Sequence, residues 1–272
     1  MPSRLEAALS RHRTWSIVAL VMLTVFAWLW LIGGAGMRTG SPGTAMPRAV
    51  TRSAIAGLAM PDPAMADPAA WGPARLALMF SMWWTMMIAM MLPSAAPTIL
   101  LHARTARRAS AAVAPGTASF LAGYLTAWGG FSLLAAALQA ILENSGLLEA
   151  MRMSSRSRWL SAAILFAAGL YQLTPAKALC LRHCRNPAGF LIRHYRPGRR
   201  GALHMGLTHG TYCIGCCWLL MTLLFVGGVM NLVWIALLAV AVAAEKLLPH
   251  GRLVSLCAGW AGMVWGVSLL LA

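Results

Sequence analysis

The chain has 272 residues, of which 60% are hydrophobic and only 10% are charged. An ordinary soluble domain carries roughly 25% charged residues, so the composition excludes a soluble globular protein. The formal net charge is +16, from 22 Lys and Arg against six Asp and Glu. Because the basic residues lie almost wholly between apolar segments, they indicate loops that anchor the chain in a lipid bilayer, and no nucleic acid partner is expected.

Seven apolar stretches follow one another, most of them near the 20 residues that a helix needs to cross a hydrocarbon core of about 30 Å. They cover residues 14–36, 76–101, 117–142, 158–174, 203–226, 229–248 and 253–272. The sequence therefore predicts an all-α fold, a polytopic transmembrane helical bundle of about seven spans. We expect Pro175 to kink the fourth span if that span continues to Leu181, and Gly227 and Gly228 to form the turn after the fifth.

The Lys and Arg residues also predict an orientation, because cytoplasmic loops of membrane proteins carry an excess of them. With a cytoplasmic N-terminus, 15 of the 22 fall on the inner side and 7 on the outer side. Residues 1–36 then form a basic segment with the first membrane anchor, 37–75 a periplasmic loop containing Pro, Gly and Met, and 76–272 the bundle that carries the site motifs. We expect a multi-pass protein of the bacterial inner membrane.

Three cysteines lie within five residues of the fifth predicted span, Cys213, Cys216 and Cys217. At 100° per residue, these cysteines and His209 share an arc of about 100° on the helix, and Met221 widens it to about 140°. The segment CLRHC places Cys180 and Cys184 one turn apart on the same side of the membrane. Structural disulfides are not expected on this reducing side, so the clusters predict metal or redox chemistry; simple packing of small apolar thiols is the alternative. The remaining Cys257 is assigned to packing.

A second group of sulfur atoms lies in MFSMWWTMMIAMMLP, residues 79–93. Its six methionines occupy one half of the predicted helix: Met79, Met82, Met86, Met87, Met90 and Met91. Methionine is also a common filler of hydrophobic cores, so packing remains an alternative. Thioethers together with thiolates favour Cu(I), whereas zinc rarely takes methionine, and the combination points to copper.

Five motifs carry a family resemblance: MMIAMMLPSAAP at 86–97, GYLTAW at 123–128, AAGLYQLTPAKALCLRHCRNP at 167–187, GTYCIGCCWLLM at 210–221 and FVGGVMNLVWIALLAVAVAAEK at 225–246. The chain resembles, over roughly residues 76–246, the bacterial family of predicted metal-binding integral membrane proteins called domain of unknown function 2182. The resemblance implies a multi-spanning inner-membrane protein with a suspected metal site, sometimes described as a copper chaperone.

Polar residues near the span ends have simpler explanations. Glu245 and Lys246 are expected to form an interfacial pair, with a functional role for Glu245 as the alternative. Gln172 and Thr174 are expected to satisfy backbone groups freed at the Pro175 kink. Four histidines outside the thiol face are expected in solvated basic loops, namely His102, His194, His204 and His250.

The sequence contains no Walker loop, GxSxG, HExxH or paired carboxylates, so an enzyme is not the favoured class. We expect a protein that binds Cu(I), or another soft metal, and hands it to a copper-receiving protein. The predicted ligands are Cys213, Cys216, Cys217, Cys180, Cys184, His209, Met86, Met87, Met90, Met91 and Met221, with Cys180 ranked above Cys184. The alternatives are a membrane thiol-disulfide oxidoreductase using Cys213 and Cys216, and a non-catalytic assembly subunit.

Overall fold

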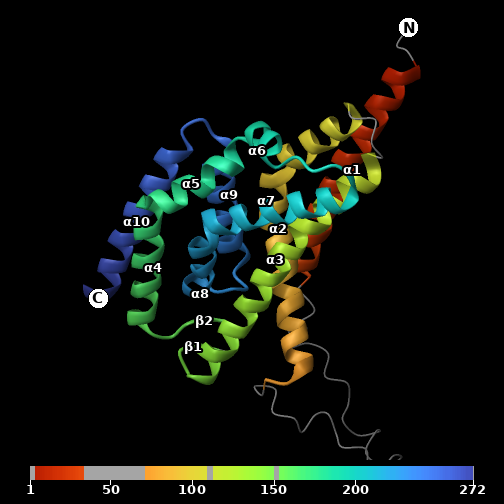
Figure 1. Ribbon diagram of the computed structural model, residues 1–272. Helices are drawn as coiled ribbons and strands as arrows, with labels where there is room; N and C mark the ends of the chain where they lie inside the picture. The colour runs from red at the N-terminus through yellow and green to blue at the C-terminus, as the bar shows by residue number, and fades with distance from the viewer. Residues whose placement is uncertain (1–3, 34–70, 109–112, 150–152, 272) are drawn as a thin grey trace, which may run out of the picture.

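The computed structural model describes residues 4–33, 71–108, 113–149 and 153–271 of the chain. Within these residues the fold is all-α, as predicted, except for one short antiparallel pair of strands (Figure 1). The elements are α1 (Arg4–Ile32), α2 (Pro73–Arg108), α3 (Val113–Asn144), β1 (Leu148–Glu149), β2 (Ser154–Ser155), α4 (Arg158–Leu173), α5 (Pro175–Arg185), α6 (Pro187–His194), α7 (Gly198–Thr222), α8 (Leu224–Gly227), α9 (Leu232–Leu247) and α10 (Gly251–Leu271). The predicted loop at 37–75 lies mainly outside the described residues.

Four helical segments are long and apolar enough to cross a membrane. They are Pro73–Ala106, Gly116–Asn144, Gly198–Gly227 and Gly251–Leu271. A fifth is added if α4 and α5, which are bent by 65° at the break between them, form one broken span. The other two predicted spans are shorter in the described residues: the apolar part of α1 has 17 residues and α9 has 16. Four or five spans are therefore supported, and the count of seven stays a prediction.

Helices α3 and α7 pack backbone against backbone, because glycines leave room for the approach. A Cβ added to Gly206 would lie 1.9 Å from the carbonyl oxygen of Phe120, and one added to Gly123 would lie 2.1 Å from that of Leu203. Small residues permit such close contacts between membrane helices. The contact fixes the rotation of α7 and so decides which of its residues face the interior.

The break between α4 and α5 has a local cause at Pro175. Proline has no backbone N–H, and it disfavours helical backbone in the residue before it. Thr174 accordingly has extended backbone with ψ 148°, and its side chain accepts a hydrogen bond from the backbone N–H of Lys177 at 3.3 Å. The predicted kink is confirmed, and the bend carries α5 across to α7, where Cys180 meets Gly215.

The predicted turn at Gly227 and Gly228 is also confirmed. Gly228 has φ 93°, a left-handed conformation that glycine adopts without steric cost. Asn231 then starts α9 by accepting a hydrogen bond from the backbone N–H of Trp234 at 3.2 Å. Helix α9 returns beside α2 and α10 and brings Glu245 and Lys246 into the interior in its last turn.

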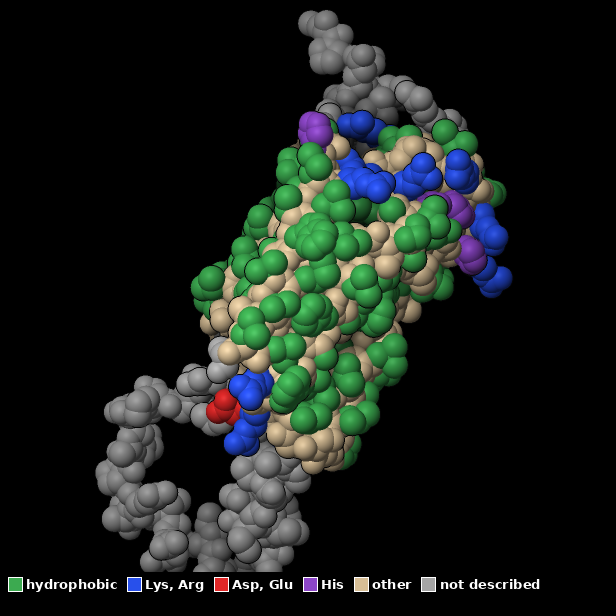
Figure 2. Space-filling model, turned by 90° about the vertical axis from the view of Figure 1, so that its left-hand side faces the viewer, with side chains coloured by type: hydrophobic (Ala, Val, Ile, Leu, Met, Phe, Trp, Pro, Cys, Tyr) green, Lys and Arg blue, Asp and Glu red, His purple; other side chains and the backbone are tan. Residues whose placement is uncertain are grey.

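One face of the molecule shows how the surface residues are distributed. Hydrophobic side chains cover its middle, and Lys and Arg gather at its two ends, mostly at the upper end (Figure 2). Leu134, Leu170, Val233 and Val264 are examples of large apolar side chains exposed on the helices. An apolar belt between basic ends is the distribution expected of helices surrounded by lipid.

Candidate metal centre

The three cysteines of α7 lie in the centre of the bundle, as the shared helical arc predicted. Cys213, Cys216 and Cys217 are each buried, and none of them forms a disulfide. The thiols of Cys216 and Cys217 both donate hydrogen bonds to the carbonyl oxygen of Cys213 at 3.0 Å. This arrangement follows from helix geometry, because residues three and four positions ahead lie on the same face.

The second cysteine pair approaches the cluster from α5. Cys180 and Cys184 are both partly buried against the hydrophobic core that contains the α7 cysteines, and Cys180 lies beside Gly215, where an added Cβ would be 2.8 Å from its Sγ. The predicted ranking of Cys180 above Cys184 stays a prediction. The ranking assumed that the fourth helix continues through Pro175, whereas α5 is bent by 65° from α4 and packs on α7.

A buried ammonium group lies among the sulfur atoms. Lys246 is 5% exposed, and its Nζ is 3.0 Å from Cys213 Sγ, 3.3 Å from Ser94 Oγ and 3.8 Å from Met91 Sδ. A lysine ammonium has three donors and no acceptor, so these three acceptors match its hydrogen-bonding capacity. Lys246 has no carboxylate partner among the described residues. Sequence reasoning treated this lysine as interfacial and missed the contact.

The neighbouring Glu245 is also buried, and its partner is not the expected Lys246. Its carboxylate forms an ion pair with Lys177 of α5 at 2.6 Å, and Gln172 donates a hydrogen bond to it at 2.9 Å. Lys177 also contacts the side-chain oxygen of Gln172. The expected interfacial pair of Glu245 with Lys246 is therefore wrong, because adjacent side chains on a helix diverge by about 100° and point to different neighbours. Gln172 was expected to satisfy backbone groups at the kink, but its side-chain nitrogen and oxygen contact Glu245 and Lys177 instead.

Tyr124 of α3 is a second contact that sequence reasoning did not single out. Its hydroxyl lies 3.2 Å from Cys213 Sγ and donates a hydrogen bond to the carbonyl oxygen of Met91 at 3.2 Å. The close packing of α3 against α7 brings it there. The available signal was its place within the motif GYLTAW, where a tyrosine is the one polar aromatic residue of an otherwise apolar stretch.

The methionines of α2 are buried as a group, but the described contacts distinguish them. Met91 Sδ lies 3.9 Å from Cys217 Sγ. Five of the methionines are 2% exposed or less, namely Met82, Met86, Met87, Met90 and Met91. Met221, one turn beyond Cys217, lines an apolar cavity with Trp83 and Phe225. The structure thus brings one thioether to the thiols and places the others in the core around it.

The largest difference between the expected and observed histidine positions is at His102. His209 is 2% exposed on the thiol face, and its Nδ1 has no hydrogen-bond partner among the described residues. His102 was expected in a solvated loop but is 3% exposed, stacked on Phe120 at a centroid distance of 4.8 Å. The reason is that α2 continues beyond the predicted end of its span to Arg108, which keeps His102 inside the bundle. His194 and His204 lie nearer the surface, on α6 and α7.

A protein family described as a copper chaperone, PpoB2, matches residues 80–269 of the chain. The chain belongs to this family. No curated protein and no solved structure shows a significant match. The matched region of this copper chaperone homologue includes the thiols of α5 and α7, most of the methionines of α2, and Lys246. The predicted copper-chaperone resemblance is confirmed at the level of the family.

The types of donor atom in the cluster suit copper, but their present positions do not form a complete metal site. In the described part of the chain, no three His, Cys, Asp or Glu side chains are placed to hold one metal ion together. The thiols of Cys216 and Cys217 instead point back to a backbone carbonyl. Soft sulfur donors nevertheless converge from α2, α5 and α7, which suits a soft ion with few ligands. Sharing an ion requires at least one of these thiols to rotate about its side-chain bond.

Proposed function

We propose that the chain is a membrane-embedded protein that binds Cu(I) through the thiolates of α7 and α5 and passes it on by ligand exchange. The observation that carries the proposal is a buried cluster of thiols that faces a buried ammonium, for which the described part of the chain supplies no carboxylate partner. Cys213 with Cys216 or Cys217 supplies the two thiolate ligands, and Cys184 is proposed to exchange with one of them when copper is passed on. Met91 supplies a neighbouring thioether, which Cu(I) accepts and zinc rarely does.

Charge balance favours a monovalent ion at this position. Two thiolates around Cu(I) carry a net charge of −1, and the ammonium of Lys246 offsets it at a distance of 3.0 Å from Cys213 Sγ. Two thiolates around a divalent ion are neutral, so the buried ammonium would remain uncompensated. Because uncompensated charge is expensive in an apolar interior, Lys246 is proposed to act as the counter-ion of a bis-thiolate Cu(I) complex.

The remaining predicted ligands are proposed to form a route to and from the thiols. His209, whose Nδ1 is free of partners in the described residues, lies one turn before Cys213. Met86, Met87 and Met90 extend from Met91 along α2 and offer weaker ligands toward the outer face. Replacing Met86 and Met90 by Leu conserves volume and should leave folding intact while slowing copper transfer. Equal transfer rates for this variant and the parent would remove the methionines from the route.

In the proposed setting, α1 and α9 complete seven spans, the N-terminus is cytoplasmic, and the protein lies in the bacterial inner membrane. The basic ends and the apolar belt support a membrane setting, and the excess of Lys and Arg in the inner loops supports this orientation. A copper-receiving protein is the proposed partner, because a chaperone's cargo must leave by exchange with another set of ligands.

A thiol-disulfide oxidoreductase is the second candidate. The observation that favours it is the ammonium of Lys246 beside Cys213, since a nearby cation stabilises the nucleophilic thiolate. In this case Cys213 and Cys216 would cycle between thiols and a disulfide. Counting thiols before and after reduction, together with metal analysis, separates a redox pair from a copper site.

The test is Cu(I) binding by competition with a chromogenic chelator under reducing conditions, for the parent and for single Ser variants at all six cysteines. We expect a large loss for Cys213→Ser and for Cys216→Ser or Cys217→Ser, and a smaller loss for Cys184→Ser. Cys257→Ser is the matched control, because that residue is exposed on α10. Equal copper retention by all six variants would rule the site out.

A further inference from the structure

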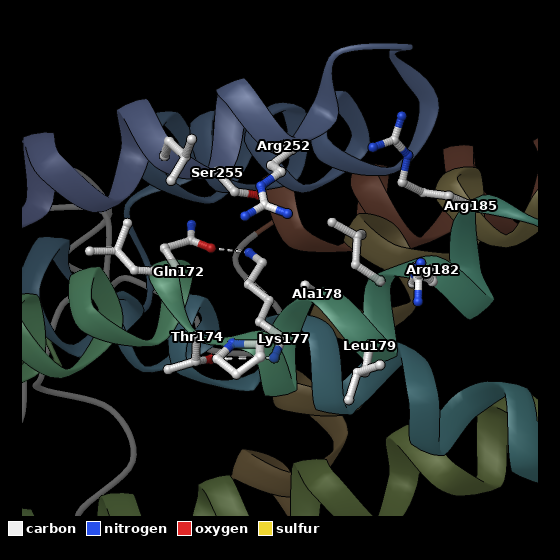
Figure 3. A pocket seen from close by; sticks show the side chains of 13 residues that line it. Gln172, Thr174, Lys177, Ala178, Leu179, Arg182, Arg185, Arg252 and Ser255 are labelled. Atoms are coloured by element: carbon white, nitrogen blue, oxygen red, sulfur yellow. Dashed lines mark hydrogen bonds between the residues drawn. The ribbon is translucent and has the colours of Figure 1, made fainter.

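A cavity of about 630 Å³ lies on the inner side of the bend between α4 and α5, and α10 forms its other wall (Figure 3). Helix α4 packs tightly on α10, because a Cβ at Gly169 would lie 2.7 Å from the carbonyl oxygen of Gly259. Since α5 turns away by 65° while α4 stays on α10, space opens between α5 and the start of α10. The residues that line the cavity include Gln172, Lys177, Leu179, Arg182, Arg185 and Arg252.

Among the described residues, the lining has four basic side chains and no acidic one. Lys177 is neutralised by its buried carboxylate partner. Arg185 donates to two backbone carbonyl oxygens just after α9, at 2.8 and 2.7 Å, which leaves its charge without a counter-ion. The guanidinium groups of Arg182 and Arg252 have neither a hydrogen bond nor an ion pair within the described ranges. Three guanidinium charges thus surround the cavity without a compensating anion, with Arg252 on the α10 wall and Arg182 on the α5 wall (Figure 3).

The other part of the wall is apolar and reaches the surface of the bundle. Leu173, Leu181 and Leu256 line the cavity, and Leu179 lines it while remaining 56% exposed. A small hydrated anion would gain nothing from leucine walls. An amphiphile with an anionic head and a hydrocarbon tail matches both parts of the lining, because basic pockets between membrane helices bind the headgroups of anionic lipids.

We propose that this cavity binds an anionic phospholipid, with the phosphate between Arg182 and Arg252 and an acyl chain running out past Leu179. The inference rests on the membrane setting proposed above and is independent of copper. Guanidinium groups suit a phosphodiester because their paired N–H donors match two of its oxygens. The lipid fills the space that the bend opens and holds α5, the helix that carries Cys184, at a fixed distance from α10.

The experiment titrates fluorescently labelled phosphatidylglycerol into the full chain in detergent micelles and measures its apparent affinity. Unlabelled phosphatidylglycerol should displace the probe, whereas phosphatidylcholine and inorganic phosphate should not. The exposed pair is tested as R182Q/R252Q, which should weaken binding on the order of 30-fold, since each basic contact contributes about a factor of five. R182K/R252K should retain part of the affinity, because lysine still binds phosphate as a point charge.

The matched control is R199Q/R200Q, which removes the same charge from the start of α7, away from the cavity. Its affinity should stay within twofold of the parent. An equal loss in both double variants would overturn the site in favour of general surface charge. Displacement by inorganic phosphate would overturn the lipid as ligand. Since the readout does not involve metal, a parent chain that fails to bind Cu(I) would contradict the proposed function and leave this result unaffected.

Discussion

Glu245 and Lys246 are neighbours in α9, yet their side chains belong to different parts of the interior. Glu245 pairs with Lys177 of α5, while Lys246 lies beside Cys213 of α7. Each contact depends on the identity of one residue, because a displacement by one position rotates a helical side chain by about 100°. Single substitutions here therefore separate the structural ion pair from the proposed copper site.

Replacing Lys246 by Leu should weaken Cu(I) binding roughly tenfold, because the bis-thiolate complex then lacks its counter-ion in an apolar setting. Zn(II) binding should not fall in parallel, so the ratio of the two affinities is the informative quantity. Lys246→Arg keeps the charge and should keep the ratio. Competition titrations with both ions measure it. A parallel loss of both affinities in the Leu variant would indicate a structural role instead.

Replacing Lys177 by Met should lower the free energy of unfolding by about 3–5 kcal/mol, because the Glu245 carboxylate is left buried without a partner. The pair is almost fully buried, with side-chain exposures of 2% and 1%. The double variant K177M/E245M removes both charges and should recover most of the loss. Thermal unfolding in detergent gives the comparison. A double variant as unstable as the single one would show that packing, and not the isolated charge, sets the cost.

At the scale of elements, the position of the thiols depends on how closely α7 approaches α3. Gly206 lets the backbones touch, and the same contact brings Tyr124 to within 3.2 Å of Cys213 Sγ. The bend at Pro175 does the equivalent for α5 and Cys184. Two local features, a glycine contact and a proline break, thus assemble donors that are far apart in the sequence.

Gly206→Ala should destabilise the bundle by about 3 kcal/mol, because the new Cβ would lie 1.9 Å from the Phe120 carbonyl oxygen and force the helices apart. Gly130→Ala in α3 is the control, since nothing lies within 4 Å of its added Cβ. Alanine also has the higher helix propensity, so this control should be neutral or slightly stabilising. Thermal unfolding temperatures of the two variants report the difference. Similar temperatures would mean that α7 can shift without cost.

At the scale of the whole molecule, the basic residues predict which end faces the cytoplasm. A reporter that is active only in the periplasm should be active when fused at Ala272 and inactive when fused at Gly201. The reason is the excess of Lys and Arg in the loops assigned to the inner side. Activity at Gly201 would place the thiols toward the oxidising side and would favour the oxidoreductase over the copper-handling protein.

Periodicity and composition predicted the helical class, the Pro175 kink, the glycine turn after α7 and the common face of the α7 cysteines. These features are local, so the spacing of residues along one helix is enough to reveal them. The partners of Lys246 and Glu245 and the burial of His102 were not predicted. They depend on how separate helices meet, and no pattern within a single segment contains that information.

The two charges at the end of α9 also bear on how the protein is made. A helix of 16 residues with Glu and Lys in its last turn is a poor candidate for entering a membrane by itself. In the folded bundle, Lys177 of α5 neutralises the charge of Glu245, and the ammonium of Lys246 lies beside Cys213 of α7. Both of those helices precede α9 in the chain. Helices α5 and α7 are therefore synthesised before α9, so the partners of both charges are already present when α9 joins the bundle.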